Sequence, residues 1–218
     1  MDLVLASNNN KKIEELSRLL APIGWTLRPQ AQLGIPECPE PHPSFVENAL
    51  AKARHAARLS GLPALADDSG LCVSALGGAP GVHSARFAGD PRSDQRNNEK
   101  LLAELATANT RQDAQQSDKT RQAYYYCVLV FLRNADDPQP IIAEGEWHGE
   151  ILSAAQGNGG FGYDPLFLVR ALGKSVAELS ASEKNRYSHR SQALSRLLER
   201  LKNAALEAMP RSQQTSQQ

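Results

Sequence analysis

The chain has 218 residues, of which 41% are hydrophobic and 22% are charged, which is ordinary for a globular protein. Its 24 lysines and arginines balance 24 aspartates and glutamates, and this balance argues against a non-specific nucleic-acid binder, because such proteins carry a basic excess. Three cysteines without a CxxC pair argue against a disulfide framework or a structural zinc site. No membrane span and no signal peptide are expected, so we expect a cytoplasmic protein.

The chain opens with a pattern of strand, polar loop and helix. Residues 2–6 predict a short buried strand, and the apolar residues from Ile13 to Leu20 recur at helical spacing. Such a loop leads into a helix N-terminus, where backbone N–H groups and a lysine favour phosphate. A polar turn with an ordinary cap is the alternative. The loop residues are Ser7, Asn8, Asn9, Asn10, Lys11 and Lys12.

A second helix is expected after a stiff loop. Four prolines between residues 36 and 43 exclude a regular element there. The stretch 44–47 fits a capping box, and Gly61 is expected to end the helix. The apolar face of this helix points to the core, whereas Lys52, Arg54 and their basic neighbours are expected on a solvated face.

Two adjacent carboxylates give the sharpest chemical signal. The apolar residues 64–66 predict a strand that leads into Asp67 and Asp68, a turn at Gly70, and a second strand over residues 71–76. Because side chains alternate along a strand, the two aspartates should point in different directions. One can be held by the protein while the other binds a hard cation such as magnesium and orients a water. An Asx-turn that satisfies local N–H groups is the alternative.

The middle of the chain predicts a helix and then antiparallel strands. Ser93 is expected to cap a helix through Leu105, and residues 107–122 are expected to form an exposed loop. Strands are expected over 124–132, 140–147 and 149–154, and a last long helix near the end. This order predicts an α/β fold with a mixed sheet. We expect a single domain over residues 1–209 and a disordered tail over 210–218.

The Gly-rich segment 157–162 matches G-x-G-x-x-G but is not a dinucleotide fingerprint, because Tyr163, Asp164 and Pro165 follow where a helix should begin. Its glycines are expected to let the backbone approach a ligand, with Phe161 as a stacking surface, and plain core packing of Phe161 is the alternative. Similarly, residues 173–175 lack the upstream glycine of a P-loop.

Near the start of a late helix, four polar residues cluster: Lys184, Ser188, His189 and Arg190. Donors of this kind suit an anion or a carbonyl oxygen. A solvated basic turn would contain the same residue types.

Taken together, these segments resemble the inosine/xanthosine triphosphate pyrophosphatase family. The resemblance covers about residues 3–202, with its pieces in the family's order. Those pieces are Ser7-x-Asn9-x-x-Lys12, Phe45-x-Glu47-Asn48-Ala49-x-x-Lys52-Ala53, Ala66-Asp67-Asp68-Ser69-Gly70-Leu71, Leu76-Gly77-Gly78-Ala79-Pro80-Gly81-x-x-Ser84-Ala85-Arg86, Gly159-Gly160-Phe161-Gly162-Tyr163-Asp164-Pro165, and Lys184 with Ser188-His189-Arg190.

The resemblance implies a two-lobed α/β fold, an active site in the cleft between the lobes, and a homodimer. It implies hydrolysis of dITP, ITP and XTP to the monophosphate and pyrophosphate with Mg²⁺. Asp68 would be the general base and, with Glu40, a metal ligand. The triphosphate would bind at residues 7–12. Ser69 would touch the substrate, and the base and sugar would be read by Phe161, Gly162, Tyr163, Asp164, Lys184, His189 and Arg190.

Two departures and two alternatives accompany this assignment. The family has acidic residues before the Phe-x-Glu-Asn segment, whereas here prolines surround Glu40, and residues 107–122 are longer than usual. A pyrophosphatase of other modified or ordinary dNTPs would show flat rates across bases. A non-catalytic nucleotide sensor would bind ITP without turnover, and the presence of Asp68 and Lys12 argues against it.

Overall fold

The computed structural model describes residues 2–21, 24–109 and 121–207. These residues form one seven-stranded sheet in the order β2-β1-β3-β4-β5-β6-β7. β1 is parallel to β2 and β3, and every later pairing is antiparallel. The strands are β1 (Asp2–Leu5), β2 (Thr26–Pro29), β3 (Ala64–Val73), β4 (Gln122–Leu132), β5 (Ile141–Ile151), β6 (Phe167–Val169) and β7 (Lys174–Ser175). The predicted α/β fold with a mixed sheet is therefore confirmed.

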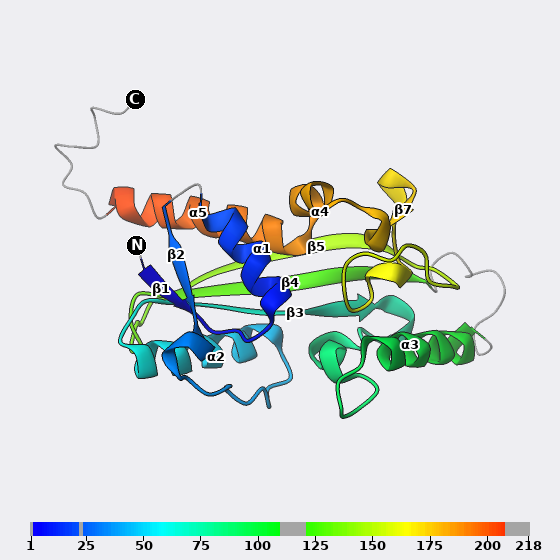
Figure 1. Ribbon diagram of the computed structural model, residues 1–218, viewed down its shortest axis with the longest axis horizontal. Coiled ribbons are helices and arrows are strands. Elements are labelled where there is room, and N and C mark those ends of the chain that lie inside the picture. Colours follow the sequence, from blue (N-terminus) through cyan, green and yellow to red (C-terminus); the bar gives the residue numbers. More distant parts are fainter. Residues whose placement is uncertain (1, 22–23, 110–120, 208–218) are drawn as a thin grey trace.

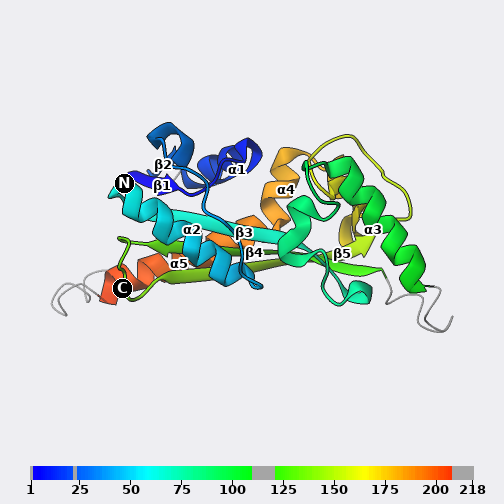
Figure 2. The ribbon, with the colours of Figure 1, turned by 90° about the horizontal axis from the view of Figure 1, so that it is seen from below.

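Within the described part of the chain, five α-helices flank the sheet (Figure 1). In that view α1 and α5 lie above the long strands, and α2 and α3 lie below them. Figure 2, seen from below, shows α2 and α3 at opposite ends of the sheet. The helices are α1 (Asn10–Leu20), α2 (Phe45–Ser60), α3 (Asp94–Asn109), α4 (Ala181–Tyr187) and α5 (His189–Glu207).

The apolar core has three parts that match this layering. α1 and α5 cover one face of the sheet around Leu129, and α2 covers the opposite face around Val130. A third cluster, around Phe167, fills the other end of the molecule, where α3 packs. Leu129 and Val130 are neighbours in β4 and point to opposite faces of the sheet. The alternation of side chains along this strand therefore separates the part of the core under α1 and α5 from the part under α2.

Two strands are longer than the sequence predicts. β3 runs unbroken through Gly70, where the sequence predicts a turn, and β5 runs unbroken from Trp147 to Gly149, where the sequence predicts a break between two strands. Gly70 is extended, and a Cβ there would overlap the carbonyl oxygen of Gly81. Gly149 likewise faces the ring of Phe167. These glycines allow close packing and do not reverse the chain. The sequence alone does not distinguish these two uses of a glycine.

The helix ends agree with the predicted signals. Ser44 caps α2, and Gly61 ends it with a positive φ of 69°. Ser93 accepts from the N–H of Arg96 at the start of α3, which continues to Asn109 inside the expected 107–122 loop. Residues 110–120 of that loop, and the tail expected to be disordered, lie outside the described residues, and β4 begins at Gln122, the last residue of the expected loop.

α5 packs directly on the backbone of β5. Gly145, in the middle of β5, faces the first turn of α5, and a Cβ there would overlap the carbonyl oxygen of His189. The absent side chain therefore sets how closely α5 approaches the sheet. Within the described ranges, no helix is long and apolar enough to cross a membrane.

Candidate active site

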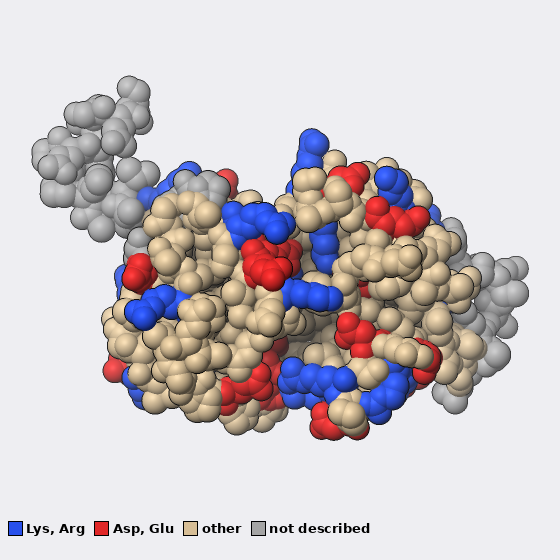
Figure 3. All heavy atoms as spheres, in the orientation of Figure 1, with Lys and Arg blue, Asp and Glu red and all other residues tan. Residues whose placement is uncertain are grey.

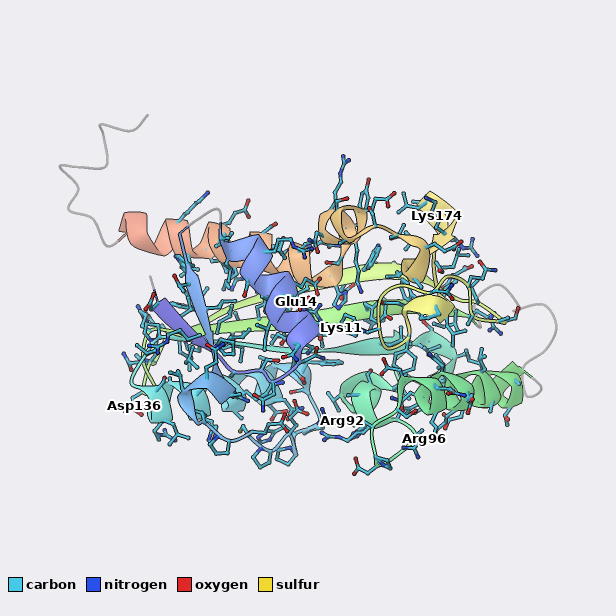
Figure 4. All side chains as sticks on the ribbon, in the orientation of Figure 1. Lys11, Glu14, Arg92, Arg96, Asp136 and Lys174 are labelled. Atoms are coloured by element: carbon cyan, nitrogen blue, oxygen red, sulfur yellow. The ribbon has the colours of Figure 1, made fainter. Side chains whose placement is uncertain are left out.

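A cavity of about 450 Å³ lies where the two ends of the molecule meet. Figure 3 shows the surface hollowed near the middle of the molecule, below the amino-terminal end of α1. In Figure 4, Lys11 on α1 lies above this region and Arg92 lies below it. The lining comes from the β1–α1 turn, the Pro-rich loop, β3, the 3₁₀ turn Gly81–Arg86, the Gly-rich loop, α4 and α5.

The two adjacent aspartates of β3 point to opposite faces of the sheet, as predicted. Asp67 lies on the face covered by α1 and α5, where it pairs with Lys12. Asp68 lies on the face covered by α2, where it pairs with Lys52. Both carboxylates line the cavity, so one strand supplies acid groups to two separate charge networks.

The Asp68 network contains a buried lysine at a helix position for which the charge pattern predicts exposure to solvent. The Nζ atom of Lys52 lies 3.0 Å from Asp68 Oδ1 and 2.8 Å from Glu40 Oε1, and its side chain is 11% exposed. The expected solvated face of α2 is thus wrong at this position, because two carboxylates stabilise the buried ammonium. Arg86 holds the other oxygen of Glu40 at 3.0 Å.

The pKa values of the titratable groups in this network shift in different directions. Burial raises the pKa of Asp68, and the opposing effect of Lys52 does not cancel it. Burial alone would lower the pKa of Lys52, but Asp68 and the neighbouring carboxylates raise it. Burial alone would raise the pKa of Glu40, but Lys52 and Arg86 lower it. A carboxylate with a raised pKa, beside a fixed cation, has the properties of a proton acceptor.

The Asp67 network is more deeply buried. Lys12 Nζ lies 2.8 Å from Asp67 Oδ2, and Arg190 Nε lies 3.6 Å from the same oxygen. Arg190 also pairs with Glu15 of α1 and donates to Ser69 Oγ at 3.1 Å. Burial acts to raise the pKa of Asp67, but Lys12 and Arg190 outweigh it and hold the pKa well below its usual range.

The β1–α1 turn places only some of its polar residues at the cavity. Ser7, Asn8, Asn9 and Lys12 line it, whereas Asn10 and Lys11 do not. The side chain of Asn9 caps α1 by accepting from the N–H groups of Lys11 and Lys12. The ordinary cap is therefore present, and it occupies two of the N–H groups that a phosphate was expected to use.

Lys11 reaches across the molecule to the Gly-rich loop instead. Its Nζ donates to the carbonyl oxygen of Gly160 at 2.9 Å and lies 5.2 Å from the centroid of the Phe161 ring. The lysine therefore ties α1 to the segment that carries Phe161.

The Gly-rich loop forms the opposite wall of the cavity, with α4 and α5 beside it. Asp164 accepts from the N–H of Phe161 at 2.9 Å, from the hydroxyl of Tyr125 at 3.1 Å, and from Lys184 at 2.6 Å. Tyr163 donates its hydroxyl to the carbonyl of Ser84 at 2.8 Å. Asp164 and Tyr163 thus hold the loop in place, while Phe161 stays half-buried at the wall.

His189 stacks on a tyrosine ring at the end of the cavity. Its ring centroid lies 4.9 Å from that of Tyr125, with the planes 13° apart. Burial and the neighbouring Arg190 lower the pKa of His189 well below its ordinary value, so the ring is neutral at pH 7. Its Nδ1 atom is buried without a hydrogen-bond partner among the described residues, which leaves that atom available to a ligand.

Most predicted site residues come together, and three important ones were missed. Apart from Asn10, Lys11 and the buried Ser188, every residue proposed from the sequence for the reaction or the substrate lines the cavity. The missed residues are Lys52, Arg86 and Glu15, which hold Glu40, Asp68 and Arg190. Lys52 and Arg86 were in the matching segments, but no local pattern distinguishes a buried ion pair from a solvated one.

Comparisons with known proteins agree on one group. A protein-family model described as the Ham1 family matches residues 3–200. A dITP/XTP pyrophosphatase of Ralstonia nicotianae is 61% identical over 203 residues, which cover 92% of this chain and 96% of that protein. The dITP/XTP pyrophosphatase of Chromobacterium violaceum is 60% identical, with 93% and 98% covered. A solved HAM1 protein from Coxiella burnetii has a TM-score of 0.84 at 43% identity, over 93% of this chain and 99% of that one.

Proposed function

The chain belongs to the Ham1 family, and from this premise we propose how its cavity carries out the reaction. The protein is a nucleoside-triphosphate pyrophosphatase that hydrolyses nonstandard purine nucleoside triphosphates such as dITP, ITP and XTP to the monophosphate and pyrophosphate. The observation that carries the assignment of roles is the pair of opposite-facing aspartates on β3, each in its own network of cations.

Asp68 is the general base of this proposal. Water must attack the α-phosphorus for pyrophosphate to leave, and a carboxylate beside the reacting phosphate can orient that water and accept its proton. The raised pKa of Asp68 supports the role, since it makes the carboxylate a stronger base than an exposed aspartate. Lys52 holds Oδ1 of Asp68 at 3.0 Å, so it orients the carboxylate.

The residues around Asp68 fit a magnesium ion. Glu40 Oε1 and Asp68 Oδ1 bind the same Lys52 nitrogen, so the two carboxylates lie side by side at the cavity wall, where both could bind one ion. Magnesium takes one or two carboxylates and completes its shell with waters and substrate phosphates. Among the described residues no three His, Cys, Asp or Glu side chains gather as a metal site, so the proposal assigns the ion two carboxylates together with waters and substrate phosphates. Such an ion would stabilise the charge of the leaving pyrophosphate.

The triphosphate is assigned to the β1–α1 turn. Lys12 and the polar side chains of Ser7, Asn8 and Asn9 line that end of the cavity, close to the amino terminus of α1. The positive end of the helix and the lysine both favour a polyanion there. Asn10 stays in the proposal through its backbone N–H group. Lys11 stays in it only through its positive charge beside Phe161, because its N–H already donates to Asn9.

The purine is assigned to the opposite wall. Phe161, Gly162, Lys184 and His189 line it, with Tyr163 and Asp164 beneath. Hypoxanthine and xanthine present an O6 acceptor where adenine presents an amino donor. A neutral His189 that donates from Nδ1 would pair with O6 and meet a donor in adenine, leaving buried donors unpaired.

Arg190 takes a different role from the one implied by the resemblance. Its guanidinium is already engaged by Glu15, Asp67 and Ser69. We therefore assign Arg190 a positioning role. Its guanidinium orients Ser69, which lines the cavity, and its ion pairs fix the first turn of α5, where His189 lies.

The decisive experiment is incubation with ITP, ATP and GTP in the presence of Mg²⁺, scored for pyrophosphate against orthophosphate. Pyrophosphate and IMP from ITP, with ATP turned over far more slowly, are expected. Release of orthophosphate with IDP as the stable product contradicts attack at the α-phosphorus, and equal rates on all bases contradict the purine assignment.

The proposal includes a homodimer that acts in the cytoplasm with no nucleic-acid or membrane partner. The cytoplasmic pool contains the free nucleotides on which such an enzyme acts, and the balanced charge of the chain suits a small ligand rather than a nucleic acid. Light scattering during gel filtration measures the oligomeric state, for which we expect twice the 23.7 kDa of one chain.

A further inference from the structure

Gly162 is held by α3 through both of its backbone polar groups. Its N–H donates to Asp94 Oδ2 at 2.7 Å, and its carbonyl oxygen accepts from Asn98 Nδ2 at 3.0 Å. Asp94 and Asn98 are four residues apart, so they lie one above the other on the same face of the helix. Two side chains of one helix therefore hold the residue that follows Phe161.

The Phe161 segment has empty space on both sides. Phe161, Gly162 and Asp94 line the main cavity, and they also line a second cavity of about 460 Å³. The loop from residue 155 to residue 160 is exposed, and Phe161 itself is only half-buried. Because the apolar core does not enclose this segment, packing alone does not fix the ring, and hydrogen bonds have to do so.

Two lysines approach the same ring from different elements. Lys184, which lines the main cavity, lies 4.5 Å from the ring centroid, and Lys11, which lines the second cavity, lies 5.2 Å from it. These cation–π contacts favour a particular ring position but are weak where water has access. The directional bonds from α3 therefore fix Gly162 itself, in addition to the contacts by which Tyr163 and Asp164 hold the rest of the loop.

We propose that Asp94 and Asn98 are positioning residues for purine recognition. They hold Gly162 so that the Phe161 ring forms a fixed wall for the purine. This inference rests on the proposed function, which places the purine against Phe161. Neither residue takes part in the chemical step, so their loss affects the binding of the purine more than the handling of the phosphates.

The test uses variants that remove one hydrogen bond each. Asn98→Leu removes the donor at similar size, and Asp94→Ala removes the acceptor. Asp94→Asn keeps an acceptor oxygen and removes only the charge, so it is the conservative variant. Gln95→Ala is the matched control, because Gln95 lies on the same turn and lines the second cavity but bonds to Glu99 rather than to the loop.

For Asp94→Ala and Asn98→Leu, we expect the KM for ITP to rise about tenfold, the scale of one lost hydrogen bond. The kcat should change less than about twofold, and the ratio of kcat/KM for ITP over ATP should fall. The inhibition constant of IMP should rise together with the KM for ITP, whereas the inhibition constant of pyrophosphate should stay at its wild-type value. Asp94→Asn should recover most of the loss.

A double-mutant cycle sharpens the test. Because both side chains hold the same residue, the double variant should raise KM by less than the product of the single effects. Equal weakening of IMP and pyrophosphate inhibition, or an Asp94→Ala variant that matches Gln95→Ala, would overturn the inference. Production of pyrophosphate from ITP by the wild-type protein, measured alongside, separates failure of this inference from failure of the proposed function.

Discussion

Arg190, in the first turn of α5, forms a buried ion pair with Glu15 of α1, 175 residues earlier in the chain. The two side chains are 2% and 9% exposed. α1 begins at the turn assigned to the triphosphate, and α5 begins at His189, which is assigned to the purine. One ion pair therefore fixes the two ends of the substrate site relative to each other.

Replacing Glu15 by Gln should destabilise the protein. The charge of Arg190 would lose its nearest carboxylate in a buried place, and breaking such a pair costs about 3 kcal/mol. Urea unfolding of the two proteins measures the difference. Glu14→Gln is the control, because Glu14 lies on the exposed side of α1 (Figure 4). Equal loss in both variants would assign the effect to helix charge rather than to the ion pair.

Replacing Asp68 by Asn should lower kcat by at least about 100-fold, the scale of a general base. The amide keeps the size of the side chain but neither accepts the water's proton nor holds a magnesium ion well. Steady-state kinetics with ITP at saturating Mg²⁺ measures this. Asp136→Asn, at a residue that is 93% exposed in a surface turn, should have no effect. Near-normal turnover by the Asp68 variant would place the base elsewhere.

Replacing Lys52 by Met should shift the pH profile as well as lower the rate. Lys52 lowers the pKa of Asp68 against the effect of burial, so its removal raises that pKa further. The base must be ionised to work, and the acid limb of kcat/KM should therefore move to higher pH. Arg54→Met, on the exposed side of the same helix, should leave the limb in place. An unchanged limb in Lys52→Met would show that Asp68 does not determine it.

His189 should make the folded state sensitive to mild acid. Its pKa is lowered in the folded protein, so between that value and about 6.5 the unfolded chain binds more protons than the folded one. The contribution of the neutral His189 to the free energy of unfolding is complete above about pH 6.5 and is lost as the pH falls below that value. The free energy of unfolding should therefore decrease between pH 7 and pH 5, and His189→Gln should show a smaller decrease. Parallel pH dependence in the two proteins would contradict a buried neutral histidine.

Local patterns predicted the elements well because local physics determines them. The helical spacing of Ile13 to Leu20 and the cap at Ser44 depend on neighbouring residues, and both are confirmed. The opposite directions of Asp67 and Asp68 follow from strand geometry alone. Unbroken β3 and β5 were not foreseen, because a glycine permits both a turn and close packing, and only its tertiary neighbours decide which.

Residues whose role depends on a distant partner were harder to interpret. Lys52 shares its helix with exposed basic residues, and only the folded chain brings Glu40 and Asp68 to it. Arg190 looked like a free donor because Glu15 is 175 residues away. The matching family segments include both basic residues, but they do not reveal which of them pairs with a buried carboxylate.

Gly145 shows how a position away from the cavity can determine specificity. Even the methyl group of alanine would push α5 off β5 and carry His189 and Arg190 with it. The place of His189, the residue assigned to the purine, thus depends on one close backbone contact between β5 and α5. Under this assignment, a side chain at position 145 would change the purine site without touching the cavity.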